Sequence, residues 1–172
     1  MNEFDDAEDI LFEVDTLISQ EKIVEAKNLL YEVLSNFPDY CKAHNHLGWI
    51  YHQKMTNYTK AETHFKLALK YAKDYFSPYM NYSYFLIDLG KYNEMITFGE
   101  HSLKVKGVDE GTILNQMAKA YELKNNLETA YSFYEKAKIK STASGYIEEI
   151  NASLYRVKEK MNLFQKIKYI FR

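Results

Sequence analysis

Small and bulky apolar residues recur along this chain in the same order every 34 or 35 positions. The two clearest copies are Leu47-Gly48-x-x-Tyr51 with Ala61-x-x-x-Phe65-x-x-Ala68, and Met117-Ala118-x-x-Tyr121 with Ala130-x-x-x-Tyr134-x-x-Ala137. Within each copy the apolar residues lie three or four positions apart, which is the spacing of one face of an α-helix. The pattern therefore predicts pairs of amphipathic helices that repeat along the chain.

Two weaker copies extend the pattern to four. They contain Ala26-x-x-x-Leu30-x-x-Val33 and Met95-x-x-x-Gly99-x-x-Ser102. The residues predicted to begin each second helix are separated by 35, 34 and 35 positions, and they are Ala26, Ala61, Met95 and Ala130. Turn-forming residues fall between the helices, at Asn57, Gly90 and Asn125-Asn126, and Ser77-Pro78 is typical of a helix start. We therefore predict four helix–turn–helix repeats at about residues 7–40, 41–75, 76–110 and 111–142.

These copies resemble the tetratricopeptide repeat (TPR) family, whose unit is a helix–turn–helix of about 34 residues with small residues between large ones. The resemblance covers about residues 7–142 and is strongest in the second and fourth copies. The chain departs from the family where a tryptophan is favoured near the start of each unit, with Ile10, His44, Tyr79 and Leu114 there instead. The resemblance implies an all-α fold, a right-handed TPR superhelix (α-α solenoid) of four helix-turn-helix repeats plus a C-terminal capping helix.

A single amphipathic pattern follows the repeats over residues 143–172. Its apolar residues recur in steps of three or four, at Tyr146, Ile150, Leu154, Val157, Met161, Phe164, Ile167 and Phe171. We predict one continuous helix that caps the last repeat and ends in a basic tail. The basic residues are Lys158, Lys160, Lys166, Lys168 and Arg172. Such helices lie on anionic membranes or pair with another helix.

Composition restricts the class of protein without naming a partner. Only six glycines and two prolines occur in 172 residues, which favours helices with short connections. No stretch approaches the roughly 18 consecutive apolar residues of a membrane span, and the N-terminus is acidic where a secretory signal would be basic and then apolar. The single cysteine, Cys41, cannot form an intramolecular disulfide. These observations predict a cytoplasmic location.

Charge is distributed unevenly along the chain. The net charge is −2, yet residues 1–40 hold 11 acidic and 2 basic residues, whereas residues 130–172 hold 9 basic and 4 acidic ones. No broad basic stripe indicates a nucleic-acid partner. Opposite charges at the two ends leave head-to-tail self-association open.

The resemblance also implies where a ligand would lie, because the first helix of each TPR unit lines the concave face. Equivalent positions on these helices form four columns: Asp15, Trp49, Tyr84 and Lys119; Phe12, His46, Asn81 and Gln116; Leu11, Asn45, Met80 and Asn115; Ile18, His52, Ile87 and Glu122. The candidate peptide- or partner-binding residues are Asn45, His46, Trp49, His52, Asn81, Tyr84, Asn115 and Lys119.

Spacing and chemistry single out the second unit among these candidates. Asn45, Trp49 and His52 lie four and three positions apart and so share one face of an α-helix. Tryptophan supplies rigid contact area at interfaces, and asparagine amides both donate and accept hydrogen bonds, which suits the backbone of an extended peptide. The alternative is that Trp49 packs between repeats and that the asparagines are only solvated.

Other chemistries find little support in the sequence. Some TPR proteins hold a C-terminal carboxylate with lysine, arginine and asparagine residues, but this chain has Leu11 and Asp15 where such groups are wanted, and an acidic groove instead suits a basic peptide. His44, His46 and His52 are two and six positions apart, which does not match a helical zinc site. No phosphate-binding glycine loop or nucleophile elbow occurs. We expect no metal, no cofactor and no enzymatic activity.

The sequence therefore predicts a non-catalytic protein- or peptide-binding scaffold that uses the concave groove. The alternative is an assembly or membrane-adjacent adaptor that acts through the basic amphipathic C-terminal helix. The expected partner is a protein or peptide ligand, and a nucleic-acid partner is not expected. Membrane contact is possible but not expected, and self-association is possible.

Overall fold

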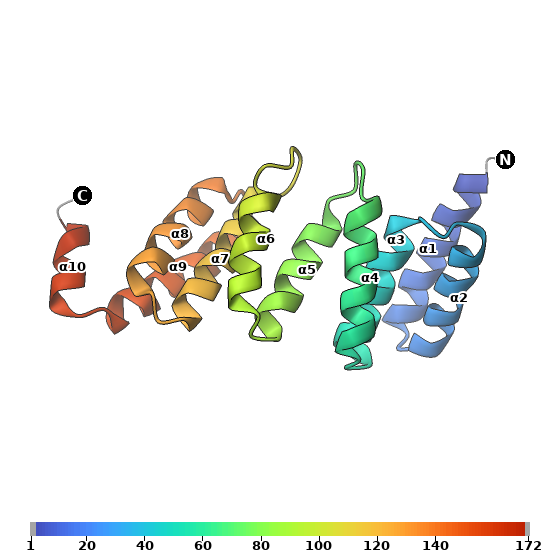
Figure 1. Ribbon diagram of the computed structural model, residues 1–172, viewed down its shortest axis with the longest axis horizontal. Coiled ribbons are helices and arrows are strands. Elements are labelled where there is room, and N and C mark those ends of the chain that lie inside the picture. Colours follow the sequence, from blue (N-terminus) through green and yellow to red (C-terminus); the bar gives the residue numbers. More distant parts are fainter. Residues whose placement is uncertain (1–2, 171–172) are drawn as a thin grey trace. The chain divides into compact units, whose positions relative to one another are not determined.

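Ten α-helices and one π-helical turn make up most of the part of the chain that the structure describes (Figure 1). The computed structural model describes the backbone of residues 3–170 and the side chains of residues 8–167. No strand occurs among these residues. The elements are α1 (Glu3–Ser19), α2 (Ile23–Asn36), α3 (Cys41–Trp49), η1 (Ile50–Lys54), α4 (Tyr58–Tyr71), α5 (Ser77–Asp88), α6 (Tyr92–Ser102), α7 (Glu110–Leu123), α8 (Leu127–Lys140), α9 (Ser144–Lys160) and α10 (Leu163–Ile170).

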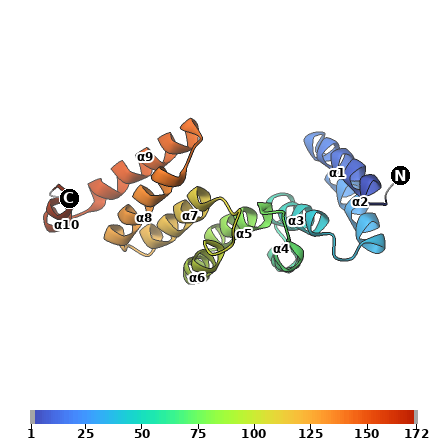
Figure 2. The ribbon, with the colours of Figure 1, turned by 90° about the horizontal axis from the view of Figure 1, so that it is seen from above.

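The chain divides into two compact units, Met1–Tyr82 and Ser83–Arg172, with the boundary inside α5. In unit 1, α1 packs against α2 and α3 packs against α4. In unit 2, α7 packs against both α6 and α8, and α8 packs against α9. In Figure 2, α1 lies beside α2, and α7 lies beside α8. The helices follow one another in the order that the four predicted repeats require. The prediction of an all-α fold built from TPR-type helix pairs is confirmed.

The turn inside each helix pair repeats with the same spacing as the sequence pattern. Its central residue has a positive φ in all four pairs, at 59°, 49°, 69° and 59°, and these residues are Glu21, Thr56, Gly90 and Asn125. The next residue donates its backbone N–H to a carbonyl near the end of the first helix, as in a Schellman cap. Three of the four positions are not glycine, so the packing of the two helices holds the left-handed conformation there.

One inserted residue explains the π-helical turn η1. The capping N–H bonds to a carbonyl five residues back in three of the pairs, but in the second pair Asn57 reaches six residues back, to Tyr51. Met55 likewise bonds to the carbonyl of Ile50, five residues back, where an α-helix would use four. The first helix of the second pair is therefore one residue longer than its equivalents, and η1 accommodates the extra residue without a change in the turn.

The second helix of each pair begins three residues earlier than we predicted. The helices start at Ile23, Tyr58, Tyr92 and Leu127. The predicted residues Ala26, Ala61, Met95 and Ala130 lie in the first turn, where the backbone N–H of each makes the first i→i−4 bond of its helix. All four side chains are fully buried. The periodicity therefore identified the first buried residue of each second helix, not the residue at which the helix begins.

Close approach of the two helices in the second pair depends on Gly48. A Cβ atom placed there would lie 2.6 Å from Cδ1 of Phe65, and the Phe65 ring is fully buried. Gly99 occupies a similarly tight place in unit 2, but the atoms it faces are Cγ and Sδ of Met117 at 2.5 Å. A phenyl ring closed in on all sides cannot move aside, whereas a methionine side chain has three rotatable bonds.

Gly48→Ala is therefore expected to destabilise the protein by about 1–3 kcal/mol, which is the usual cost of overpacking a core. Gly99→Ala is expected to destabilise the protein less than Gly48→Ala does, because the buried Met117 side chain can rotate and alanine favours the helix. Denaturant unfolding followed by circular dichroism measures both. Equal effects of the two substitutions would show that the rigid Gly48–Phe65 contact does not set the helix spacing.

The C-terminal segment is two helices, which corrects the prediction of one continuous helix. Helix α9 packs on α8, and its residues Ile150, Val157 and Met161 join the core of the fourth pair. Met161 has extended backbone angles (φ −67°, ψ 144°) and ends α9. Helix α10 then starts a new direction (Figure 1). Phe171 and Arg172, which belong to the predicted apolar stripe and basic tail, lie outside the described residues.

Local hydrogen bonds explain the break. The backbone N–H of Gln165 donates to Asn162 Oδ1 at 2.9 Å, and the backbone N–H of Asn162 donates to Gln165 Oε1 at 3.0 Å. This reciprocal arrangement is a capping box, which satisfies free N–H groups at a helix N-terminus. It favours a new helix start at Leu163 over continuation of α9.

Candidate functional site

A pocket of about 390 Å³ lies in unit 1 against helices α1, α3 and α5. We call it the Trp49 pocket. It is lined by Asp15, Ile18, Asn45, His46, Trp49, Tyr75, Ser77, Met80 and Asn81. Four of the eight predicted binding residues therefore come together here. They are Asn45, His46, Trp49 and Asn81.

Trp49 supplies the largest ring of the pocket and is only partly buried. Lys54 Nζ lies 5.8 Å from the centre of the Trp49 ring system, within the range of a cation–π contact. The contact comes from η1. A partly exposed tryptophan is the kind of residue that anchors a bound side chain.

Asn45 lines the pocket, but its side-chain amide is engaged in internal hydrogen bonds. Its side chain is 4% exposed. Asn45 Nδ2 donates to the hydroxyl of Tyr75 at 3.1 Å, and Asn45 Oδ1 accepts from Asn81 Nδ2 at 3.0 Å. Asn45 therefore fixes the positions of Asn81 and Tyr75, and Asn81 is the partly exposed amide of the pair.

His46 and Asp15 form the polar edge of the pocket. His46 Nε2 lies 3.1 Å from Asp15 Oδ1, and His46 Nδ1 lies 2.8 Å from the backbone carbonyl oxygen of Lys42. The Asp15 side chain is 66% exposed. One edge of the pocket thus presents a carboxylate to solvent, next to the apolar surface of Trp49 and Ile18.

His52 does not join the Trp49 pocket. It is 7% exposed, and its ring makes edge-on contacts with Tyr58 and Phe65 of the α4 region, at ring-centre distances of 6.2 and 6.4 Å. The prediction assumed α-helical spacing from Asn45 through His52. Because η1 begins at Ile50, that spacing does not hold and the side chain of His52 turns toward α4.

The remaining predicted residues lie in unit 2, around Tyr146 of α9. Asn115 is 1% exposed, and its Nδ2 donates to the Tyr146 hydroxyl at 2.9 Å. Tyr84 is 39% exposed, and burial raises the pKa of its hydroxyl, which lies beside that of Tyr146. Lys119 Nζ is 3.0 Å from Glu149 Oε1. Asn115 and Lys119 therefore connect α7 to α9.

The same hydrogen bond occurs in both units. Asn45 and Asn115 hold equivalent positions in the second and fourth repeats, and each donates to a tyrosine hydroxyl about 30 residues further on, Tyr75 or Tyr146. Sequence reasoning missed these two tyrosines. Their signal was available, since a tyrosine follows each asparagine by 30 or 31 positions. Its meaning is structural, because the bond ties the first helix of a repeat to the residues that follow the second helix.

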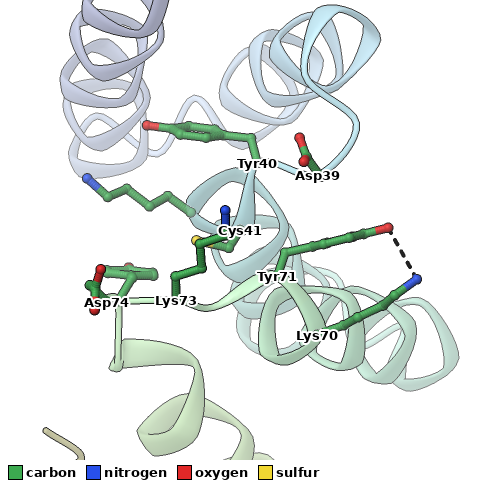
Figure 3. A pocket seen from close by; sticks show the side chains of 9 residues that line it. Asp39, Tyr40, Cys41, Lys70, Tyr71, Lys73 and Asp74 are labelled. Carbon is green, nitrogen blue, oxygen red and sulfur yellow. Dashed lines mark hydrogen bonds between the residues drawn. The ribbon is translucent and has the colours of Figure 1, made fainter.

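A second pocket in unit 1, of about 420 Å³, lies at the loop end of the second helix pair (Figure 3). Lys70 Nζ lies 3.4 Å from the Tyr71 hydroxyl and 4.9 Å from the centre of its ring. Asp39 and Asp74 offset the charge of the lysines around it. The pocket contains Cys41, and burial raises the pKa of its thiol. Because the thiolate is the nucleophilic form, Cys41 is poorly suited to catalysis.

Unit 2 has a smaller pocket of about 340 Å³ between α7 and α9. Two of its basic residues, Arg156 and Lys160, are already paired with Glu122, whose side chain is 7% exposed. The third, Lys119, is paired with Glu149. Burial alone would raise the pKa of Glu122, but hydrogen bonds from Arg156, Lys160 and Tyr134 lower it to about 2. This cluster therefore holds helices together and offers little free charge to a ligand.

Within residues 8–167, no group of three histidine, cysteine or acidic side chains is arranged to hold a metal ion. None of the described helices combines the length and the apolar character that a membrane-crossing helix needs.

Comparisons with known proteins agree with this geometry. The tetratricopeptide repeat family model matches residues 42–75 and 111–138. Among solved structures, the crystal structure of PilW, a widely conserved type IV pilus biogenesis factor, matches with a TM-score of 0.65 at 13% identity, over 88% of this chain and 77% of that one. No curated protein matches. The two segments are the second and fourth predicted repeats, so the chain carries tetratricopeptide repeats. At 13% identity the likeness to PilW shows the fold alone.

Proposed function

We propose that this chain is a non-catalytic scaffold that binds a peptide segment of a partner protein in the Trp49 pocket. The observation that supports this most is the pocket itself: about 390 Å³ of open space on the faces of α1, α3 and α5, with a partly exposed tryptophan in its lining. A pocket of this size accommodates a few side chains rather than a folded domain.

The lining indicates the chemistry of the peptide. Ile18, Trp49 and Met80 give apolar surface that suits a bulky aliphatic or aromatic side chain. Asp15 places a largely exposed carboxylate at the edge, and the first 40 residues carry nine more acidic than basic residues. Attraction between opposite charges favours and steers a basic partner. The proposed ligand therefore has a bulky apolar side chain close to a lysine or arginine.

A non-catalytic role is part of the proposal. The titratable groups with the largest departures from ordinary pKa values are locked in internal hydrogen bonds, as His64 and Glu122 are. Cys41 is held as a thiol by burial. The single cysteine also supports our proposal of a cytoplasmic location, because disulfides mark oxidising compartments.

Trp49→Ala is expected to weaken binding at least tenfold toward peptides selected from a random display library against the full-length protein. Asp15→Asn is expected to weaken the binding of only those peptides that carry a basic residue. The loss of affinity should be severalfold, because an exposed carboxylate contributes little to an ion pair. Fluorescence anisotropy of labelled peptides measures both. Ile139→Ala, at a site 80% exposed on α8, is the matched control and should leave affinity unchanged.

Circular dichroism and thermal unfolding separate a binding defect from a folding defect. If Trp49→Ala binds the selected peptides as tightly as the wild type, the pocket is not their site. If Trp49→Phe also fails to fold, Trp49 is part of the core and the proposal is wrong.

A further inference from the structure

Three apolar side chains of α10 are exposed to solvent. Leu163, Phe164 and Ile167 are 70%, 85% and 42% exposed. Leu163 and Phe164 lie four and three positions before Ile167, so the three side chains share one side of the helix. We call this the tail face. Exposed apolar patches of this kind usually mark an interaction site.

Helix α10 is built as a separate element rather than as a frayed end of α9. Met161 is 4% exposed and belongs to the core with α9. The capping box of Asn162 and Gln165 then starts α10 as a new helix. The apolar residues before the break, Val157 and Met161, are buried, whereas the apolar residues after it are exposed. The tail face is thus presented to solvent by a defined local structure.

The chemistry of this segment matches the ligand that the Trp49 pocket is proposed to take. From Leu163 to Arg172 the sequence contains three basic residues and no acidic one. One of them, Lys166, has Nζ 3.8 Å from Glu159 Oε1, at the limit of an ion pair. The segment thus combines bulky apolar side chains with nearby positive charge.

The complementary surface is on the same chain. Asp15 gives the Trp49 pocket an exposed carboxylate, and Phe12, one helical turn earlier on α1, is 78% exposed. Asp9 and Glu13 flank Phe12 and are exposed as well. The exposed surface of α1 therefore has acidic residues around an apolar side chain. A helix with basic and apolar residues would complement this surface.

We propose that the α10 segment of one copy binds the Trp49 pocket and the adjoining acidic face of α1 on a second copy. This contact is heterologous, because the two surfaces differ, and it links copies head to tail. It rests on the proposed function of the Trp49 pocket and names the partner as this chain itself. Phe164 and Leu163 supply the apolar contact, and Lys166 faces the carboxylate of Asp15.

Two measurements test the proposal. A synthetic peptide of residues 161–172 is titrated into the full-length protein while the fluorescence of Trp49, the only tryptophan, is followed. The expected result is saturable binding that raising the salt concentration weakens, since exposed charges are screened. In sedimentation velocity, the intact protein should then show association that increases with its concentration.

The variants are chosen at exposed positions so that folding is preserved. Phe164→Ser should reduce self-association at least tenfold, whereas Ile139→Ser, at an exposed isoleucine between Lys138 and Lys140, should leave it unchanged. Lys166→Glu and Asp15→Lys should each weaken association. A mixture of these two variants, or the double variant, should restore self-association, because positions 15 and 166 then carry opposite charges again.

The outcomes separate this inference from the proposed function. If selected peptides bind the Trp49 pocket but the 161–172 peptide does not, the second copy is not the partner and the pocket still binds peptides. Binding of α10 to anionic phospholipid vesicles without self-association would overturn the inference in favour of a membrane surface. The inference would also be overturned if the intact protein stays monomeric in sedimentation and its Trp49 fluorescence does not depend on protein concentration.

Discussion

Lowering the pH from 7 to about 4 is expected to destabilise unit 1 by about 3 kcal/mol through His64. His64 of α4 is 9% exposed, and burial, aided by His44 and Lys60, lowers its pKa from 6.5 to about 4. The folded-state pKa is below the unfolded one, so the stabilisation is complete above pH 6.5 and is lost as the pH falls toward 4. One pKa unit corresponds to about 1.4 kcal/mol.

The hydrogen bonds around His64 give a reason for this shift. His44 Nε2 lies 3.0 Å from the carbonyl oxygen of Pro38, which only accepts, so we assign the His44 proton to Nε2. His44 Nδ1 must then accept from His64 Nδ1–H across 3.1 Å. His64 Nε2 in turn accepts from the hydroxyl of Tyr31 at 3.3 Å.

This chain of bonds is complete only when both rings are neutral. Tyr31 accepts in turn from Tyr51, whose hydroxyl oxygen is 2.9 Å away. A proton added to His44 Nδ1 would place two N–H groups against each other. Burial also lowers the pKa of His44, while Asp39 and the Pro38 carbonyl act in the opposite direction. The network joins α2, α3, η1 and α4, so its loss loosens the first helix pair from the second.

Urea unfolding followed by Trp49 fluorescence at pH 7, 6, 5 and 4.5 measures the effect, since Trp49 reports on unit 1. Glu8 contributes little to the slope above pH 4.5, because hydrogen bonds from Lys42 and Tyr40 lower its pKa and its contribution is lost only at lower pH. His64→Gln should be less stable at pH 7 and should flatten the pH dependence. A wild-type stability that is constant between pH 6.5 and 5 would contradict the neutral network.

Glu122→Gln is expected to destabilise unit 2 by about 3 kcal/mol. Arg156 donates to both oxygens of Glu122 at 2.9 Å, and Lys160 Nζ donates to Oε1 at 2.8 Å. The buried hydroxyl of Tyr134 donates to Oε2 at 2.9 Å. One side chain of α7 therefore connects α8 and α9, and an amide can satisfy only part of these donors.

The same carboxylate gives unit 2 a separate acid dependence. The pKa of Glu122 is lowered from 4.5 to about 2 in the folded protein, so its contribution is present above pH 4.5 and is lost as the pH falls toward 2. Glu149→Gln is the matched control. Its pair with Lys119 is exposed, at 53% and 28% of the side chains, and removing it should cost less than about 0.5 kcal/mol. Equal losses from both variants, measured by thermal and urea unfolding, would contradict the account.

Much of the fold could be predicted because it depends on local signals. The turn positions have the same separations as the helix starts, and Asn57 and Asn126 cap their helices with side-chain bonds to the N–H three residues on. The pairing of Gly48 with Phe65 follows from the alternation of small and large residues. Such features are properties of one helix pair and are visible in a short stretch of sequence.

The candidate site was harder to predict because its side chains depend on neighbouring repeats. Whether Asn45 is free or buried is decided by Tyr75, which lies 30 positions away. The position of His52 depends on η1, whose signal was a mismatch of one residue: Asp15 and Trp49 are 34 positions apart, whereas Ala26 and Ala61 are 35 apart. The start of α10 had a signal too, since Asn162 precedes Gln165 by three positions, the spacing of a capping box.

The side-chain N–H signals of Trp49 and Asn81 in a nitrogen-15 correlation spectrum show whether a peptide binds in the Trp49 pocket. When a peptide selected for binding is added to the full-length protein, the account predicts that the Trp49 indole signal and the Asn81 amide signals shift together and saturate at the same peptide concentration. The buried amide of Asn115 in unit 2 should stay unchanged. If the peptide saturates the protein while the Trp49 and Asn81 signals do not move, the Trp49 pocket is not the binding site.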